Sequence, residues 1–287
     1  MPAQAHASRR RTLTFDDAPE WLRDNPFVRT GYRPQLPPRA AALTALAWGH
    51  NETLNVWTHA AGLALFAWAA ARDAADPRVG ARWPLLLFDG AAAACMAASV
   101  AFHALGCVSE RCACACMRAD LAGIAAVMWA MYWPWVWYAF PPAAVAPRTA
   151  YLACASAVAA GTLCAVVLRP PAPGAGRGGG KAARAALFAV QGALGAAPLA
   201  HACALGWPPA RRAAAWVAAQ LALHALGAAV YVARVPERYA CGGAWGPLVD
   251  ALGGSHALFH VLVVAGLAAF HRGVLGLAVA RADATHH

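Results

Sequence analysis

The chain has 287 residues, of which 61% are hydrophobic and only 13% are charged. A soluble domain usually has about 45–50% apolar and about 25% charged residues, so this composition indicates a bilayer protein rather than a soluble core. The formal charge of +10 would suit a nucleic-acid partner, but the basic residues lie between apolar segments and no nucleic-acid-binding motif is recognisable. We therefore predict a helical membrane protein that binds no nucleic acid.

The N-terminal part of the chain, residues 1–52, is predicted to be a cytosolic tail. No secretory signal peptide is visible, so the first apolar span is expected to act as the insertion signal. Residues 16–25 have the pattern of a short amphipathic helix, because an Asp can cap its start and Asn25-Pro26 can end it. The basic triplet Arg9-Arg10-Arg11 favours an anionic membrane surface, with a disordered tail as the alternative.

Seven apolar segments follow the tail, each close to the roughly 20 residues that a membrane-spanning helix needs. The stretches between them carry prolines, glycines and charges, and residues 170–181 are predicted to be a flexible loop. The seven-helix domain is expected to cover residues 53–280, followed by a short tail at 281–287. The predicted spans are residues 53–72, 84–105, 119–140, 149–168, 185–205, 212–233 and 255–279.

The distribution of basic residues predicts how the bundle is oriented. Most of the 23 Lys and Arg residues fall on the side that holds the N-terminal tail and the second, fourth and sixth loops. The positive-inside rule then puts the N-terminus in the cytosol and the C-terminus on the lumenal or outer side. The predicted fold class is thus an all-α membrane protein with seven transmembrane helices.

Three histidines and one aspartate from three predicted spans fall at one depth, near the cytosolic side. His103 lies near the end of the second span, Asp120 in the first turn of the third, and His256 and His260 in the first two turns of the seventh. A spacing of four residues puts His256 and His260 on one helix face. Two such histidines and a third from another helix can form an open zinc site with water in the fourth position.

Neighbouring polar groups extend this hypothesis. Asp120 could hold or deprotonate the water or orient a ligand, and Ser99, one turn before His103, could hydrogen-bond a bound polar group. Ionisable residues inside a membrane suggest function by default. A single histidine in a span is nevertheless more often structural, so a metal site and a hydrogen-bonded cluster both remain open from the residues alone.

Other polar residues in the spans give weaker signals. Asp89, early in the second span, could face a cavity or pair with an interfacial arginine, and the sequence does not decide between them. We interpret four further histidines as structural, because they lack spaced partners: His50, His201, His224 and His271.

The nine cysteines do not predict a disulfide framework. Those inside the spans are expected to act as small apolar filler: Cys95, Cys154, Cys164 and Cys203. Four others crowd the predicted second loop, where reduced thiols, acylation and a metal cluster are the alternatives: Cys107, Cys112, Cys114 and Cys116.

The order and spacing of several motifs resemble the progestin and adipoQ receptor family. The matches run from about residue 25 to residue 271 and include an opening signature, motifs in the second and third spans, and a C-terminal signature. They are residues 25–28 (NPFV), 31–34 (GYRP), 51–59 (NETLNVWTH), 99–103 (SVAFH), 120–124 (DLAGI), 235–239 (VPERY) and 253–260 (GGSHALFH).

This resemblance implies seven spans, a cytosolic N-terminus and a zinc ion held by His103, His256 and His260. Asp120 and Ser99 would surround the water and would be catalytic only if the protein is a hydrolase. Members of the family have been linked to ceramide hydrolysis at this zinc, and others are hormone receptors of the adiponectin-receptor type. A membrane lipid in the bundle cavity is a further expected ligand.

Three stretches are most similar to a Golgi-resident member of the family that binds Raf kinase. They are residues 25–38, the Val-Pro-Glu-Arg-Tyr stretch at 235–239, and Pro198 with His201. This closer resemblance implies a Golgi membrane scaffold that sequesters Raf and lowers Raf–MEK–ERK (MAPK) signalling without being an enzyme. A zinc-dependent lipid amide hydrolase and a hormone receptor are the alternatives.

Overall fold

The computed structural model describes residues 12–46, 49–168 and 179–284. The predicted basic triplet Arg9-Arg10-Arg11 and most of the predicted loop at 170–181 lie outside these residues. Within them the chain forms helices and connecting segments, and its strand-like pairing is confined to an isolated bridge between Leu13 and Tyr32.

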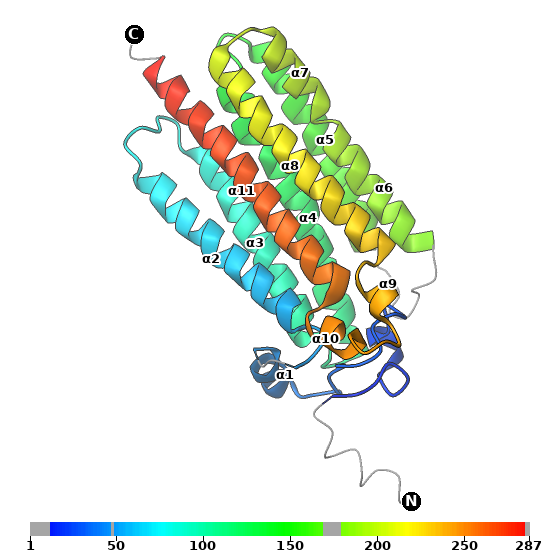
Figure 1. Cartoon of the computed structure of the whole chain (residues 1–287). Coiled ribbons are helices and arrows are strands. Elements are labelled where there is room, and N and C mark those ends of the chain that lie inside the picture. Colours follow the sequence, from blue (N-terminus) through cyan, green and yellow to red (C-terminus); the bar gives the residue numbers. More distant parts are fainter. Residues whose placement is uncertain (1–11, 47–48, 169–178, 285–287) are drawn as a thin grey trace, which may run out of the picture.

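Long helices run side by side along one direction and form the body of the molecule (Figure 1). Within the described ranges, six helical stretches are long and apolar enough to cross a membrane. The 23 residues of α2 would extend about 35 Å, which exceeds the roughly 30 Å hydrocarbon core, so α2 completes a bundle of seven. The long helices are α2 (Thr53–Ala75), α3 (Trp83–Leu105), α4 (Glu110–Ala139), α5 (Val145–Leu168), α6 (Gly179–Ala193) with α7 (Ala196–Ala204), α8 (Pro208–Ala233) and α11 (Gly254–Asp283).

The predicted fifth span, residues 185–205, is not one continuous helix. It is divided between α6 and α7 by a turn at Leu194 and Gly195. Pro198 explains the break, because its ring lacks an N–H for the carbonyl of Leu194 and would clash with that carbonyl in a regular helix. At the other end of the chain α11 continues to Asp283, beyond the predicted start of the tail at residue 281.

The prediction of an amphipathic helix at residues 16–25 is wrong. Only a single 3₁₀ turn, η2 (Glu20–Leu22), forms there. The Arg23 side chain donates hydrogen bonds to the carbonyls of Ala18 and Asp16, and the backbone N–H of Phe15 pairs with the carbonyl of Arg29. These contacts provide hydrogen-bond partners for backbone N–H and C=O groups of the segment, so a helix is not needed to pair them. A helix that the sequence did not predict, α1 (Pro38–Ala45), forms later in the segment.

The N-terminal segment packs against the connection between α8 and α11, and we refer to residues 12–46 and 235–253 together as the cap. The connection contains α9 (Glu237–Ala240) and α10 (Gly246–Ala251). The carboxylate of Asp250 accepts hydrogen bonds from the backbone N–H groups of Arg29 and Thr30 and from the Thr30 hydroxyl, at 2.8–3.0 Å. The cap covers one end of the bundle, and the C-terminus lies at the opposite end, called here the far end (Figure 1).

The predicted cysteine-rich loop is shorter than expected. α4 begins at Glu110, and the Ser109 hydroxyl caps it by accepting a hydrogen bond from the backbone N–H of Cys112. Cys112, Cys114 and Cys116 therefore lie in the first turns of a helix, while Cys107 is buried before it. All nine cysteines lie within the described residues, and all are free thiols.

The core of the bundle brings α2, α3 and α11 close together. A side chain added at Gly62 of α2 would place its Cβ 2.8 Å from Val264 Cγ2 and 2.9 Å from Met96 Sδ. These distances are below normal van der Waals contact, so α2 can approach the two neighbouring helices only because residue 62 is glycine. His59 and Asn55, on the first turns of α2, are thereby held close to the start of α11.

Candidate metal centre

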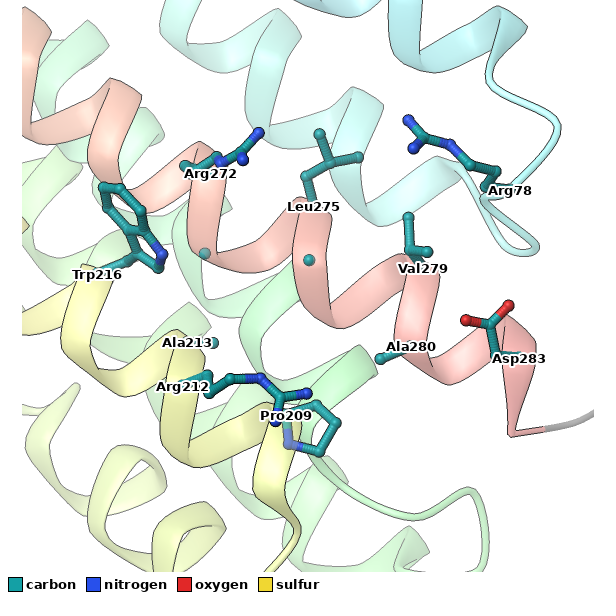
Figure 2. Close-up of a pocket in the computed structure, with 12 residues that line it drawn as sticks. Arg78, Pro209, Arg212, Ala213, Trp216, Arg272, Leu275, Val279, Ala280 and Asp283 are labelled. Atoms are coloured by element: carbon teal, nitrogen blue, oxygen red, sulfur yellow. The ribbon is translucent and has the colours of Figure 1, made fainter.

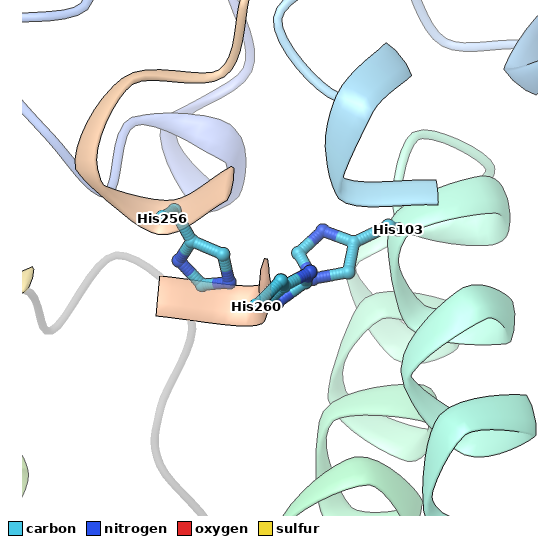
Figure 3. Close-up of side chains that lie close together, drawn as sticks. All are labelled: His103, His256 and His260. Carbon is cyan, nitrogen blue, oxygen red and sulfur yellow. The ribbon is translucent and has the colours of Figure 1, made fainter. Parts of the chain in front are cut away.

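Three histidines converge at the capped end of the bundle. His103 lies in the last turn of α3, and His256 and His260 lie in the first two turns of α11 (Figure 3). The ring centroids are 5.0 Å apart for His103 and His256, 4.9 Å for His103 and His260, and 4.6 Å for His256 and His260. One nitrogen from each ring lies within 4.8 Å of the others. The structure thus brings together the histidines that the sequence singled out.

The environment of His103 fits a zinc ligand. Its Nδ1 lies 2.7 Å from Glu52 Oε2, whereas its Nε2 is buried and has no hydrogen-bond partner among the described residues. An imidazole that donates its Nδ1–H to a carboxylate presents the lone pair of Nε2, and this arrangement is typical of zinc sites. The unpartnered Nε2 is therefore available to bind a metal ion at the centre of the three rings.

Glu52 immediately precedes α2 and was missed as a site residue. Burial would raise the pKa of the Glu52 carboxyl, but its electrostatic interaction and hydrogen bond with His103 and a hydrogen bond from Asn55 hold that pKa well below its usual range. The carboxylate is thus ionised and able to orient His103. An acidic residue at the start of the first span, at the predicted depth of His103, is the signal that could have identified it.

His260 is held in a similar way by α2. Its Nδ1 lies 3.2 Å from the backbone carbonyl oxygen of Asn55 and 3.3 Å from Thr58 Oγ1, so the opposite nitrogen is left for a metal ion. His256 is half-buried and packs against the Tyr231 ring of α8, with centroids 5.2 Å apart. The centre therefore depends on α2 and α8 as well as on the helices that carry the three ligands.

A fourth histidine, His59 of α2, lies against the centre and was not predicted. Its ring stacks on that of His260 with centroids 3.5 Å apart and planes 10° apart. Both of its ring nitrogens are buried and lack a hydrogen-bond partner among the described residues. His59 is outside the group whose ligand atoms converge, so we assign it a packing contact with His260 and no coordination.

Asp120 and Ser99 lie beside the three histidines. Asp120 is half-buried on α4 and is close enough to interact electrostatically with His103 and Ser99. Ser99 is buried, and its Oγ makes no hydrogen bond of normal geometry within the described part of the chain. Asp120 is not among the residues whose ligand atoms converge, which agrees with a role next to the metal ion rather than on it.

Arg33 links the cap to the histidine centre. Its side chain is only 4% exposed, and its guanidinium donates hydrogen bonds to the carbonyl oxygens of His103 and Ala41. The sequence had counted Arg33 only as one of the charges that set topology. In the structure it fixes the end of α3 against α1.

Two pockets lie at opposite ends of the bundle. A groove of about 240 Å³ with an almost entirely apolar lining lies at the capped end, and it is linked to the centre by Thr58, which lines the groove and contacts His260. A groove of about 400 Å³ lies at the far end, along the outer face of α11 (Figure 2). Only the first is placed to serve the histidines.

The remaining predicted histidines have hydrogen-bond partners. His50 contacts the carbonyl of Thr44, His201 contacts the Tyr151 hydroxyl, and His224 contacts Gln220. These contacts agree with structural roles. His271 lies 2.7 Å from an oxygen of Asp73 and belongs to a separate cluster at the far end.

The fold and the centre define a class, namely seven-helix membrane proteins with a histidine cluster at one end of the bundle. The chain belongs to the haemolysin-III related family, whose model matches residues 47–271. It is 32% identical to heptahelical transmembrane protein 1 of Arabidopsis thaliana, with 92% of this chain and 80% of the relative covered. These matches confirm the membrane-protein class and the seven-helix fold.

Two animal relatives confirm the predicted family. The chain is 31% identical to the adiponectin receptor protein of Drosophila melanogaster, over 93% of this chain and 60% of the relative. It is 28% identical to progestin and adipoQ receptor-like protein 1 of Caenorhabditis elegans, over 97% of this chain and 63% of the relative. The closer resemblance to a Raf-binding Golgi member stays a prediction.

Proposed function

We propose that this protein is a zinc-dependent hydrolase that cleaves an amide bond in a membrane lipid at the capped end of the bundle. The observation that carries this proposal is the buried, unpartnered Nε2 of His103, which Glu52 aims at the meeting point of three imidazoles. Zinc bound by His103, His256 and His260 would polarise the amide carbonyl and make a water molecule more acidic.

The residues around the histidines suit the proton transfers of amide hydrolysis. The oxygen of water bonds to the carbonyl carbon, the C–N bond breaks, and the products are a fatty acid and an amine. Asp120 accepts the proton that the water loses and delivers it to the nitrogen of the leaving amine. Ser99 Oγ, which has no partner of its own in the described structure, donates a hydrogen bond to the substrate carbonyl oxygen.

The apolar groove at the capped end supports a lipid substrate. Its walls come from the starts of α2 and α11 and from the cap, and an acyl chain lying there would reach Thr58, which contacts His260. A chain of this kind gains roughly 0.8 kcal/mol for each CH₂ that it buries. Ceramide, an N-acyl sphingolipid, is the test substrate that this chemistry and the family resemblance favour.

The hydrolase proposal predicts different losses for different residues. Purified protein in detergent should release free fatty acid from ceramide, and His260→Ala should abolish both this release and bound zinc. Asp120→Asn should keep the zinc but lower kcat about 100-fold or more, as expected for loss of a general base. Fatty-acid release and metal content are measured on the same samples.

His224→Ala is the matched control for these variants. His224 is a half-buried histidine on α8 that contacts Gln220 and lies outside the three-histidine group, so zinc and turnover should persist. Turnover that survives in His260→Ala would refute the proposed mechanism.

We further propose that the cap retains Raf kinase at Golgi membranes and thereby lowers MAPK signalling, as the sequence resemblance implies. An ordered surface supports this second role. α1 carries Leu43, which is 66% exposed, next to the exposed Arg39, so the cap presents apolar and basic groups together. Retention of a kinase needs no turnover, so the two functions are separable.

The Raf proposal is tested by a point substitution in the cap. Deletion of residues 1–40 would also remove Arg33, which holds the end of α3. A loss of Raf recruitment after this deletion could therefore result from misfolding rather than from loss of the binding surface. Leu43→Glu should instead release Raf from Golgi membranes while zinc content is unchanged. Leu205→Glu, at an exposed leucine of the far end, is the control. Raf that stays on Golgi membranes containing Leu43→Glu would contradict the proposal.

A further inference from the structure

A second cluster of potential metal ligands lies at the far end, in the same three helices that pack around the histidine centre. It consists of Asp73 in the last turns of α2, Asp89 in the second turn of α3, and His271 of α11, with one ligand atom from each within 4.8 Å of the others. Asp89 precedes His103 by fourteen residues, or about 21 Å of helix. The cluster is therefore separate from the histidine centre.

The cluster is buried, and this makes its charges costly. Asp73 and Asp89 have no exposed surface, and His271 is only 9% exposed. Nε2 of His271 lies 2.7 Å from Asp73 Oδ2 and 3.6 Å from Asp89 Oδ1. Two carboxylates buried side by side in a membrane protein are unfavourable unless a positive charge compensates them or one of them takes up a proton.

Asp73 has such compensation and Asp89 does not. Arg72 donates two hydrogen bonds to Asp73 Oδ1, at 2.6 and 2.9 Å. Both oxygens of Asp89 are buried without a hydrogen-bond partner in the described structure, and Oδ1 faces His271. An unpaired buried carboxylate is unfavourable, and a cation held between Asp89 and the two neighbouring ligand groups would neutralise it.

The other arginines at the far end do not supply the missing charge. Arg78 and Arg272 line the groove on the outer face of α11, and Figure 2 shows both guanidinium groups on that face. Arg78 is paired with Asp76. The charged side chains that interact with Asp89 are Asp73, His271 and Arg72, of which only Arg72 carries a permanent positive charge.

We propose that Asp73, Asp89 and His271 bind a divalent metal cation of the Mn²⁺ or Zn²⁺ class. Two carboxylates neutralise a divalent charge, and one imidazole with two carboxylates is a ligand set that these metals accept. Ligand bonds of about 2.1 Å at angles near 90–110° put ligand atoms about 3.0–3.4 Å apart. The separations of 2.7 and 3.6 Å bracket this range, so small side-chain shifts complete the site. Arg72 then orients Asp73 from outside the metal.

The experiment uses Mn²⁺ and the full chain carrying His260→Ala, so that the three-histidine centre is disabled. After treatment with EDTA and reloading with Mn²⁺, bound metal is counted by mass spectrometry and by the Mn²⁺ EPR signal. One Mn²⁺ per chain is expected with His260→Ala alone, and at least a fivefold loss when Asp89→Asn is added. Asp76→Asn, at the same end but paired with Arg78 outside the cluster, should retain the ion.

Thermal unfolding distinguishes a metal site from a plain ion pair. If Asp89 lacks a partner without metal, Asp89→Asn should unfold at the same or a higher temperature than its parent in EDTA, and at a lower temperature in Mn²⁺. A protonated His271 that merely pairs with Asp89 would instead make Asp89→Asn less stable in EDTA, with Mn²⁺ having no effect. That result, or equal Mn²⁺ content with and without Asp89, would overturn the proposal. His271→Gln serves as a second variant with the same expectations for metal content.

Discussion

At the scale of single residues, the groups that hold the imidazoles matter as much as the imidazoles. The Glu52 carboxylate and the Asn55 backbone carbonyl each contact one histidine ligand through its Nδ1 and so select which nitrogen faces the centre. Groups in this outer position typically contribute 10- to 100-fold to metal affinity. The histidines alone, without these partners, would be free to rotate or to present the wrong nitrogen.

Glu52→Gln tests this dependence directly. The amide keeps the size of the side chain but loses the charge that holds His103, so zinc affinity should fall about 10- to 100-fold. Competition with a chromophoric chelator measures the change. Glu20→Gln, at an exposed position of the cap, should leave the affinity unchanged. Equal affinity in the two variants would show that Glu52 does not orient the ligand.

At the scale of helices, the centre exists because α2 lies very close to α3 and α11. Gly62 permits this approach, and the stack of His59 on His260 lies one turn away. Three of the seven helices thus carry polar residues at two levels, near the cap and near the far end, with Phe66, Phe88 and Phe270 packed between them.

Gly62→Ala should separate these helices. Its new Cβ would lie within 3 Å of Val264 and Met96, so we expect a loss of about 1–3 kcal/mol in stability and weaker zinc binding. Gly161→Ala is the matched control, because nothing lies within 4 Å of a Cβ built there. That substitution should be neutral or stabilising by up to about 1 kcal/mol, from helix propensity alone. The measurement is the unfolding temperature of each variant relative to the wild type. Equal changes in the two variants would exclude close packing at Gly62.

At the scale of the whole molecule, the bundle has two unlike ends, and its orientation across the membrane assigns one compartment to each. The cap and the three histidines share one end of the bundle, so orientation decides which compartment supplies their substrate or partner. The excess of basic residues predicts that this end faces the cytosol.

A tag fused to the N-terminus should therefore be digested by protease added to intact, sealed membrane vesicles. A tag at the C-terminus should be cut only after the membrane is permeabilised. The reverse pattern would invert the predicted topology and would place the proposed lipid chemistry in the other leaflet.

The sequence determined the apolar segments, their approximate limits and the ligands most suited to zinc. Hydrophobic length and the four-residue spacing of His256 and His260 are local properties, so they can be read without coordinates. The structure confirmed the seven-helix fold, and the family comparison confirmed the family.

Other features depend on contacts between segments that are far apart in the sequence, and these are visible only in the folded structure. Side-chain bonds from Arg23 replaced the expected helix at residues 16–25 by a turn, and Pro198 divided the fifth span. Glu52 meets His103 and Asp73 meets His271 only because α2 packs beside α3 and α11. Hydrophobicity and residue spacing specify which face of a helix is buried but not which polar group lies opposite. The residues that complete the two clusters, Glu52 and Asp73 among them, are therefore identified only by the contacts in the folded chain.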